Sequence, residues 1–461
     1  MKALRDPNRL LTEGLGAIRG QFKVPAGFPP ELEAAAQAAV ERNPTEHKDR
    51  TAEPFVTLDP ASSTDLDQAF TIEAADGDLL LHYAIADVAW FVRDGDPLDG
   101  EAWARGETLY LPDGKAGLYP KALSEGAASL LPDGPRPAVV FTTRVAPDGA
   151  VKLEAAERAI IRSRAKLAYE TATEAELPAG FAELSRRITG AEAARGAARI
   201  DPPEQQVERD ALGHFNLVLR PLDLAEQRNA ALSLATNLAV ADALYAAKTG
   251  LFRVMAGPDD RAIARLRYTA RALGLSWPAA HSLETFEKTL DPAQPNAAAF
   301  MLAIRRAGNG ASYVPYQAGV KPWHAAMAAT YCHMTAPLRR LADRYVIRAA
   351  LAVVNGQPVP AEVTAAFAQL GPVMGKADAR ANQIDRAVID LAEAAMLSGR
   401  EGETFSAVVT DFDDVGPRIQ LCDLPVVTRV TAHSVTPGEK LTVRLVAADP
   451  VKRTVSFARI A

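Results

Sequence analysis

The stretch TLDPASSTDLDQAF, residues 57–70, places three aspartates within nine residues of a β-prone region. It continues a run, FVTLD, that predicts a strand ending at Asp59, and the following proline keeps that residue extended. After the loop ASST, Asp65 and Asp67 stand two residues apart where we expect the next strand to start. Because strand side chains alternate between the two faces, this spacing predicts that both carboxylates share one face.

The three aspartates are candidate ligands for a hard cation. Carboxylates that converge from so short a segment would repel one another unless a cation lay between them. Oxygen ligands without histidine or cysteine favour Mg²⁺ or Mn²⁺ over Zn²⁺. The alternative is an ordinary turn in which Asp and Ser side chains bond to their own backbone. The residues alone leave both interpretations open.

The surrounding sequence predicts a sheet followed by a helical region. Apolar, β-prone runs separated by Gly, Pro and Asp occupy 55–59, 69–73, 79–92 and 138–145. Beyond about Lys166 the chain is rich in helix formers. We expect helices within 211–249, 259–273, 297–307, 323–352 and 361–397.

A second unusual segment is MTAPLRRLADRYVIRAAL, residues 334–351. Thr335 is a plausible N-cap, so Arg339 and Arg340 would lie in the first turn of a helix. The helix dipole already presents positive charge there, so two arginines destabilise the turn unless they bind an anion. The segment therefore predicts a phosphate site. The competing explanation is that Asp343 pairs with both arginines.

The two ends of the chain differ from this central part. Leu10, Leu11, Leu15 and Ile18 recur at helical spacing, and a second helix-forming run follows two prolines at 29–30. These helices predict either a helix-turn-helix unit or an arm that packs on the main domain. Beyond about residue 400, five short β-prone runs predict a small OB-type barrel. Its alternative is a β-module that only packs or dimerises.

Composition bounds the class of protein. At roughly 150 residues per domain, 461 residues predict two to four domains. With 48% hydrophobic and 23% charged residues, the chain is neither wholly disordered nor a coiled coil. Its two cysteines exclude a disulfide framework. The net charge of −6 argues against an overall basic surface but permits a local basic channel.

Targeting and cofactor motifs are few. The first residues lack an apolar signal segment, and polar residues interrupt the most apolar stretch, 230–247. We therefore expect a cytoplasmic protein with no membrane span, and we expect a monomer. The sequence has no P-loop, no nucleophile elbow and no paired histidine spacing typical of zinc sites.

Taken together, these segments resemble the ribonuclease II (RNB) family of exoribonucleases. The resemblance rests on FVTLDPASSTDLDQAF, LHYAIADVAWFV, LYLPDG, LFRV and TAPLRRLADRYVIRAAL, in that order. It implies an α+β chain of three parts. These are a small N-terminal helical domain (1–50), a mixed α/β RNB catalytic domain (51–400) and a C-terminal five-stranded OB-type β-barrel that binds RNA (401–461).

The resemblance also implies an activity. Family members hydrolyse single-stranded RNA from the 3′ end with Mg²⁺, releasing nucleoside 5′-monophosphates, and Mn²⁺ is a possible substitute. Rival interpretations are a catalytically weakened RNA-binding protein on the same fold, a folding or assembly subunit, and a nuclease that acts on DNA. The helices of 1–50 are not expected to encode the cold-shock-type domains that usually precede the family's catalytic domain.

Individual residues inherit expected roles from the match. Asp59, Asp65 and Asp67 match the acidic metal centre, and we expect Asp67 also to position the attacking water or a second cation. Gln68 stands where the family has a further aspartate, so its carbonyl oxygen becomes a weaker expected ligand. Arg339 matches the arginine that contacts the scissile phosphate.

Three further residues are expected to bind the substrate. Tyr110 matches the tyrosine that stacks on the terminal base. Arg340 adjoins the phosphate-binding arginine, and Asp385 falls where the family has a supporting glutamate. Other aromatic side chains, Phe252 and Trp323 among them, could stack on bases but more often belong to a core.

Overall fold

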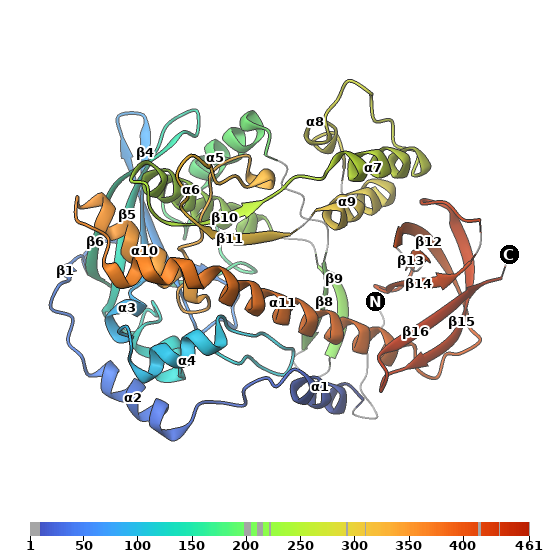
Figure 1. Cartoon of the computed structure of the whole chain (residues 1–461), viewed down its shortest axis with the longest axis horizontal. Coiled ribbons are helices and arrows are strands. Elements are labelled where there is room, and N and C mark those ends of the chain that lie inside the picture. Colours follow the sequence, from blue (N-terminus) through green and yellow to red (C-terminus); the bar gives the residue numbers. More distant parts are fainter. Residues whose placement is uncertain are drawn as a thin grey trace.

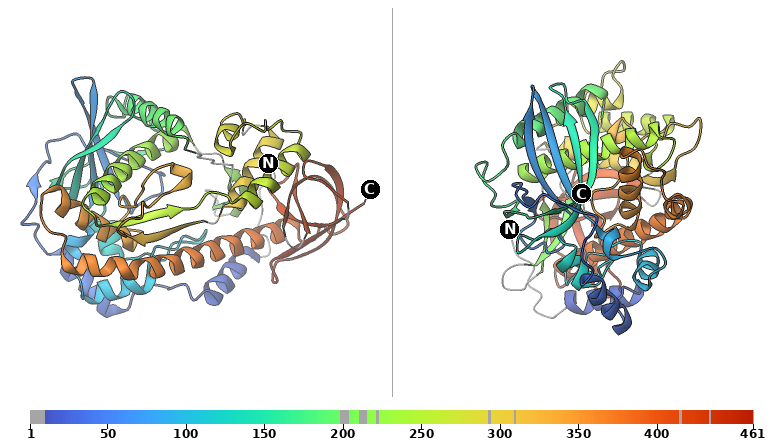
Figure 2. Two further views of the ribbon diagram at one scale, coloured as in Figure 1. Left: turned by 45° about the horizontal axis from the view of Figure 1, so that its top comes forward. Right: turned by 90° about the vertical axis from the view of Figure 1, so that its left-hand side faces the viewer.

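The structure is a computed structural model of the chain. It describes residues 10–197, 204–209, 215–220, 223–291, 294–308, 310–413, 416–432 and 434–460. Two lobes are joined by one long helix, α11 (Ala361–Leu397), which runs from a sheet-containing lobe to a small barrel (Figures 1 and 2).

A five-stranded sheet forms the centre of the larger lobe, in the order β1-β6-β5-β4-β3. Its strands are β1 (Lys48–Asp49), β3 (Gln68–Ala75), β4 (Asp78–Ala86), β5 (Arg136–Val145) and β6 (Val151–Ile161). Strands β3 to β6 pair antiparallel in sequence order, whereas β1 pairs parallel to β6. The predicted runs at 69–73, 79–92 and 138–145 thus contribute three adjacent strands.

Helices cover this sheet and bury its apolar side chains. They are α5 (Phe181–Arg195), α6 (Leu224–Ala246) and α10 (Leu341–Val354). Helix α6 touches the sheet, α5 and α10, so it is apolar on most sides, as expected for a buried helix. The polar residues that interrupt its sequence acquire a role in the cavity described below.

Shorter elements surround this core. They are β2 (Thr57–Asp59) with β7 (Lys166–Ala168), α3 (Val88–Phe91), α4 (Pro97–Arg105), β8 (Glu204–Arg209) with β9 (Phe215–Arg220), β10 (Leu251–Met255) with β11 (Ala311–Pro315), α7 (Asp260–Ala272), α8 (Leu283–Glu287) and α9 (Pro295–Ala307). Helices α7, α8 and α9 share a small apolar core of their own.

The C-terminal segment closes into a five-stranded barrel, as predicted. Its strands are β12 (Thr404–Asp413), β13 (Gly416–Leu421), β14 (Val427–Thr431), β15 (Lys440–Asp449) and β16 (Thr454–Arg459). The order around the barrel is β12-β13-β14-β16-β15. Strand β15 alternates buried and exposed side chains along Lys440–Val446, as a barrel wall requires.

The N-terminal helices α1 (Leu10–Gln21) and α2 (Pro30–Val40) pack on the body of the protein at separate places (Figure 1). Leu11, Leu15 and Ile18 of α1 share a core with α11, whereas α2 packs into the core of the sheet lobe. Among the described residues, these contacts are those of a packing arm.

Two details of the sequence interpretation were wrong. The helix expected within 323–352 begins only at Leu341, because residues 328–340 form an irregular loop with a turn at 337–339 that contacts other elements. The segment 211–249 includes the strand β9, and the hairpins β8–β9 and β10–β11 were not predicted. No helix in the described parts of the chain combines the length and apolarity that crossing a membrane requires.

Candidate active site

A cavity of about 760 Å³ opens between the sheet, α6 and the loop that precedes α10. One part of its wall carries the side chains of Asp59, Asp65 and Asp67, which we call the acid wall. Residues 331–340, the arginine loop, supply Arg339 and Arg340 to the same cavity. The carboxylates and the arginines to which the family resemblance gives catalytic roles thus line the same cavity.

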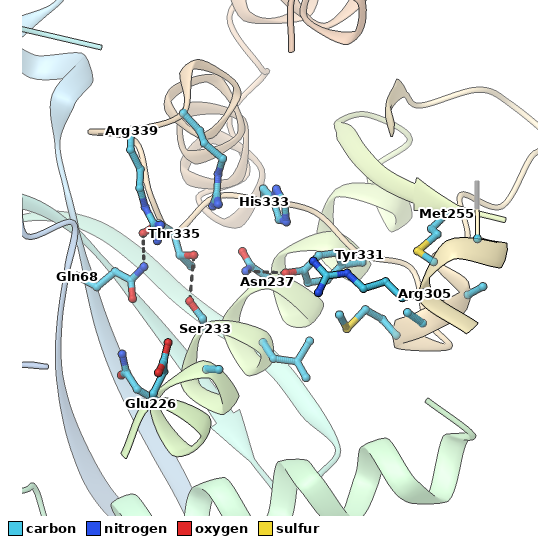
Figure 3. A pocket seen from close by; sticks show the side chains of 18 of the residues that line it. Gln68, Glu226, Ser233, Asn237, Met255, Arg305, Tyr331, His333, Thr335 and Arg339 are labelled. Carbon is cyan, nitrogen blue, oxygen red and sulfur yellow. Dashed lines mark hydrogen bonds between the residues drawn. The ribbon is translucent and has the colours of Figure 1, made fainter. Parts of the chain in front are cut away.

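The cavity continues beyond these charged groups. Its lining also includes Met255, Glu284 and Arg305. Figure 3 shows Met255 and Arg305 on the opposite side of the pocket from Gln68 and Arg339. Charged side chains therefore are not confined to the part of the cavity that holds the acid wall.

The acid wall is built from a strand end and a loop. Asp59 is the last residue of β2, which pairs with β7. Asp65 and Asp67 precede β3, so the expectation that they begin a strand was wrong. Between them Leu66 is buried, and its backbone N–H donates to Ser129 Oγ at 2.8 Å. With the intervening leucine buried in the core, both carboxylates still reach the cavity.

Asp67 is the most buried member of the acid wall, with 5% of its surface exposed. Its Oδ1 accepts a hydrogen bond from the Leu338 backbone N–H at 2.7 Å, and its Oδ2 lies 3.4 Å from Arg339 Nε. Burial raises the pKa of Asp67 to about 8, although Arg339 and the Leu338 amide act in the opposite direction. The favourable contacts of the Asp67 carboxylate thus do not fully offset the cost of burying its negative charge.

The other two carboxylates differ in their surroundings. Burial raises the pKa of Asp59 to about 6, and the neighbouring charge of Asp65 adds to this rise. Asp65 itself lies 2.7 Å from Lys115 Nζ, and its Oδ2 accepts a hydrogen bond from the Tyr110 hydroxyl at 3.1 Å. Tyr110 is thus fixed by the acid wall while its ring stays half exposed.

The two arginines have different partners. Arg340 donates to both carboxylate oxygens of Asp343, at 3.0 and 2.7 Å, and Asp343 also accepts from the Ala336 backbone N–H. The predicted pairing with Asp343 therefore holds for Arg340 only. Arg339 approaches Asp67 instead, and 45% of its side chain is exposed. Both residues precede α10, so the expectation of a helical first turn was wrong.

A smaller cavity of about 210 Å³ shares Tyr110 with the larger one. Its lining includes Tyr110, Arg339, Arg340 and Asp385, the last from α11. The structure thus brings together every predicted substrate-binding residue. Glu107 also lines this cavity, and burial together with nearby acidic side chains raises its pKa to about 7. Nothing in its sequence surroundings had indicated this residue.

Helix α6 contributes a polar row that sequence analysis missed. Asn229, Ser233 and Asn237 are spaced by four residues, so they lie on one face, and all three line the larger cavity. Asn229 donates to the Leu58 carbonyl, Ser233 donates to Thr335 Oγ1, and Asn237 accepts from the Met334 backbone N–H. Their regular spacing within an apolar helix was the signal that could have revealed them.

Gln68 faces the arginine loop through its amide group (Figure 3). Its Nε2 donates to the Thr335 carbonyl at 2.6 Å, and its Oε1 accepts from the Tyr83 hydroxyl at 2.5 Å. The oxygen that was expected to bind a cation therefore already accepts a hydrogen bond from a fully buried tyrosine.

The donor set suits a hard divalent cation, although its carboxylates also have other partners. The acid wall offers only oxygen ligands, the chemistry that Mg²⁺ prefers. Within the described ranges, however, no three His, Cys, Asp or Glu side chains converge closely enough to hold a metal ion. The metal assignments therefore stay predictions.

The remaining aromatic candidates divide by exposure. Phe252 is fully buried and packs against Tyr245, so it belongs to the core and is not a base platform. Trp323 is 45% exposed, and Lys321 Nζ lies 5.0 Å from its ring centre. Among the described aromatic side chains singled out from the sequence, Tyr110 combines exposure with a place beside the acid wall.

Comparisons with known proteins agree with this arrangement. Residues 47–356 match the family model of the RNB domain, and residues 403–460 match that of the RNase II-type exonuclease C-terminal S1 domain. The chain is 27% identical to ribonuclease R of Aquifex aeolicus over 456 residues, which cover 92% of this chain and 64% of the relative. The corresponding match to ribonuclease R of Escherichia coli is also 27% identical and covers 87% and 54%. The chain thus spans between half and two thirds of these relatives.

Solved structures show the same fold. The apo form of Mycoplasma genitalium RNase R superposes with a TM-score of 0.85 at 20% identity, covering 100% of this chain and 79% of that one. Yeast Ssd1, described as a pseudonuclease, gives a TM-score of 0.70 at 16% identity and covers 96% and 57%. Because a pseudonuclease shares the fold, the fold by itself does not decide between catalysis and binding.

Proposed function

The chain belongs to the RNB domain family, and on this premise we propose that it is a magnesium-dependent exoribonuclease. It would hydrolyse single-stranded RNA from the 3′ end and release nucleoside 5′-monophosphates. The observation that carries this proposal is Asp67, a buried carboxylate 3.4 Å from Arg339 in a cavity large enough for nucleotides. Incompletely compensated charge in a cavity is typical of a functional site.

Arg339 is the proposed phosphate ligand. Its guanidinium is exposed to the cavity beside the acid wall, and the preceding residue, Leu338, is held through its backbone by Asp67. A guanidinium fixed in this way can bind two phosphate oxygens and stabilise negative charge that develops on them during hydrolysis. It needs little reorganisation at the moment of reaction.

Tyr110 and Asp385 are proposed to hold the terminal nucleotide. The Tyr110 hydroxyl is anchored on Asp65, so its ring can offer a stacking face without turning away. The cavity of about 210 Å³ that it shares with Asp385 lies beside Arg339. A nucleoside bound there would present its 5′ phosphate to the arginine and the acid wall.

Asp59, Asp65 and Asp67 would hold the divalent cation, which supplies charge neutralisation and activation of a water molecule when it is bound. The carboxylates must be ionised to serve as ligands. Asp67 would in addition orient the attacking water. Its Oδ1 accepts from the Leu338 backbone N–H, whereas its Oδ2 lies beside Arg339, the proposed phosphate ligand. Mn²⁺ is the expected substitute for Mg²⁺.

The second candidate function is RNA binding without catalysis. It is favoured by the amide of Gln68 at a position where a further carboxylate was expected, and by the engagement of that amide with Tyr83 and Thr335. The acid wall and Arg339 favour catalysis, because binding alone would gain nothing from three carboxylates beside a phosphate ligand.

The test is to incubate purified protein with Mg²⁺ and single-stranded RNA that carries a label throughout its length. Labelled nucleoside 5′-monophosphates should appear from the start of the reaction, and a chelator should stop their release. A second RNA that is blocked by a 3′ phosphate tests whether degradation starts at the 3′ end. A DNA of the same sequence tests whether the enzyme requires ribose. Tight RNA binding without any mononucleotide would instead support the non-catalytic alternative.

A further inference from the structure

Gln68 and Asp67 are neighbours in sequence that hold the arginine loop at two points. Asp67 accepts from the Leu338 backbone N–H at 2.7 Å, and Gln68 donates to the Thr335 backbone carbonyl at 2.6 Å. One bond uses an acceptor side chain and the other a donor side chain. Together they fix the loop on both sides of Pro337, directly before Arg339.

The orientation of the Gln68 amide is determined by its partners. A backbone carbonyl can only accept, so the nitrogen must face Thr335. The oxygen then faces the Tyr83 hydroxyl, which donates to it. Burial keeps Tyr83 protonated by raising its pKa, so the donor persists at any ordinary pH.

Further contacts tie this amide to the centre of the protein. Tyr83 lies on β4, and its hydroxyl is 3.3 Å from Ser233 Oγ on α6. Ser233 in turn donates to Thr335 Oγ1 at 3.0 Å, as Figure 3 shows. The loop is thus attached to β3, β4 and α6 by one small network of neutral groups.

An aspartate at position 68 could not make the same contact. Its side chain is shorter by one methylene group, and an ionised carboxylate has no hydrogen to donate to the Thr335 carbonyl. A polar group that is buried without its partner is costly. The glutamine at this position therefore matches the need of the loop rather than the need of a cation.

From these contacts we propose that Gln68 is a positioning residue that sets the arginine loop, and with it Arg339, against the acid wall, and that it is not a metal ligand. This inference rests on the proposed function for the role of Arg339, but the placement of the loop is independent of turnover. It replaces the expectation that Gln68 donates its oxygen to the cation.

The test combines metal binding with a double-mutant cycle. Gln68→Met keeps the volume of the side chain and removes both hydrogen bonds. Binding of Mn²⁺ without RNA, followed by electron paramagnetic resonance, should change less than twofold. Asp59→Asn, which removes an expected ligand, is the matched control and should weaken Mn²⁺ binding at least tenfold.

The cycle asks whether Gln68 acts through Arg339. Gln68→Met should lower kcat/KM about tenfold in the otherwise unchanged protein, since it removes buried hydrogen bonds. In protein that already carries Arg339→Ala, the same change should have less than a twofold effect. The same cycle on the Kd for single-stranded RNA in the presence of chelator needs no hydrolysis, so it still decides the matter if the protein proves inactive.

Tyr83→Phe provides a second variant if Gln68→Met does not fold. It leaves Gln68 in place and removes the hydroxyl that orients its amide. We expect a smaller loss of kcat/KM, about threefold, with unchanged Mn²⁺ binding. Weakened Mn²⁺ binding in Gln68→Met comparable to that in Asp59→Asn, or full additivity with Arg339→Ala, would overturn the proposal.

Discussion

Two aspartate–arginine pairs in this protein, one in the core and one beside the larger cavity, use the same chemical groups in different ways. Asp99 of α4 and Arg344 of α10 lie in the core of the sheet lobe, both almost completely buried. Arg344 donates to Asp99 and, at 2.8 Å, to the Tyr345 hydroxyl, while the second oxygen of Asp99 accepts from the Gly95 backbone N–H. This pair is enclosed, and its partners are other buried polar groups, although the Nε of Arg344 has no hydrogen-bond partner.

Asp67 and Arg339 form the second pair, which faces the larger cavity. Their closest atoms are 3.4 Å apart, Arg339 is nearly half exposed, and the pKa of Asp67 is raised to about 8. A buried carboxylate with a distant and partly solvated partner contributes little to stability. The difference between the pairs indicates that the core pair supports the fold, whereas the cavity pair is kept available for a ligand.

The largest expected effect comes from removing the charge of the cavity pair. Asp67→Asn should lower kcat for RNA hydrolysis by about 10³-fold or more, because the acid wall loses a ligand and the water its acceptor. The amide oxygen can still accept from the Leu338 N–H, so the unfolding midpoint should stay unchanged or rise. Release of mononucleotides and thermal unfolding measure the two quantities.

Binding of single-stranded RNA provides the control for this variant. Affinity measured with chelator present should stay within about threefold of that of the unchanged protein, since Arg339 and Tyr110 remain. Retained turnover in Asp67→Asn would remove the role assigned to this carboxylate and would leave the contrast between the two pairs without a functional meaning.

The reverse behaviour is expected of the core pair. Asp99→Asn leaves the buried guanidinium of Arg344 with neutral partners only, which should lower the free energy of unfolding by about 3–5 kcal/mol. At a temperature where the variant stays folded, kcat per folded molecule should remain within a few-fold of the unchanged value. Urea denaturation and RNA hydrolysis on the same preparation test both statements.

A more exposed ion pair serves as the matched control for the core pair. Asp94 lies 2.7 Å from Arg348 near the same helix, with about a third of its side chain exposed. Asp94→Asn should therefore cost less than about 1 kcal/mol. Equal losses in Asp94→Asn and Asp99→Asn would show that burial is not what distinguishes the core pair.

Variants of Tyr110 test whether the groups beside the cavity pair bind the substrate. Tyr110→Ala removes the proposed stacking face and should reduce kcat/KM about tenfold to a hundredfold, as expected from about 1–3 kcal/mol per stacked base. Tyr110→Phe removes only the hydrogen bond to Asp65, so it should stay within about threefold. If both variants lost the same activity, the hydroxyl rather than the ring would be the important group.

Much of this arrangement could be predicted from local sequence. The barrel strands beyond residue 403 correspond to five separate β-prone runs, because each strand alternates and is bounded by turn residues. The family resemblance of the acidic and arginine-rich segments implied roles in one reaction, and the cavity contains both. These features depend on short stretches, which is why the pattern was sufficient.

Other features depend on residues far apart in the chain. Thr335 is a suitable N-cap by type, but its hydroxyl accepts from Ser233 and its carbonyl accepts from Gln68, and a separate turn at 337–339 precedes the helix. Gln68 was expected to bind a cation because it stands where the family has an aspartate, and its hydrogen bond with Tyr83, fifteen positions away, leaves no signal at position 68. Tertiary hydrogen bonds of this kind override local propensity and cannot be inferred from spacing.

Glu393 of α11 is a buried carboxylate of a third kind, with backbone and amide partners. It accepts from the Val427 backbone N–H at 2.8 Å and from Gln205 Nε2 at 2.7 Å, so it joins α11 to the barrel and to β8. Burial raises its pKa from 4.5 to about 7, which the two hydrogen bonds oppose. As with Asp67, its pKa stays raised despite its partners, but unlike Asp67 it lines neither of the two cavities described above.

This carboxyl predicts the smallest effect, a pH dependence of stability. Because its folded pKa lies above its unfolded value, the folded state keeps the proton longer. Its contribution to stability is therefore full below about pH 4.5 and is lost as pH rises towards 7, with a slope of up to about 1.4 kcal/mol per pH unit.

Glu393→Gln keeps an oxygen acceptor for Val427 and removes the titration. The difference in unfolding free energy between the two proteins, measured by urea at pH 5, 6, 7 and 8, isolates this group from Glu107 and Asp59, whose pKa values are also raised. If the unfolding free energies of the two proteins changed with pH in parallel, protonation of Glu393 would not affect stability at the junction with the barrel. A raised carboxyl pKa would then have a consequence only where a cavity gives the carboxylate access to a ligand.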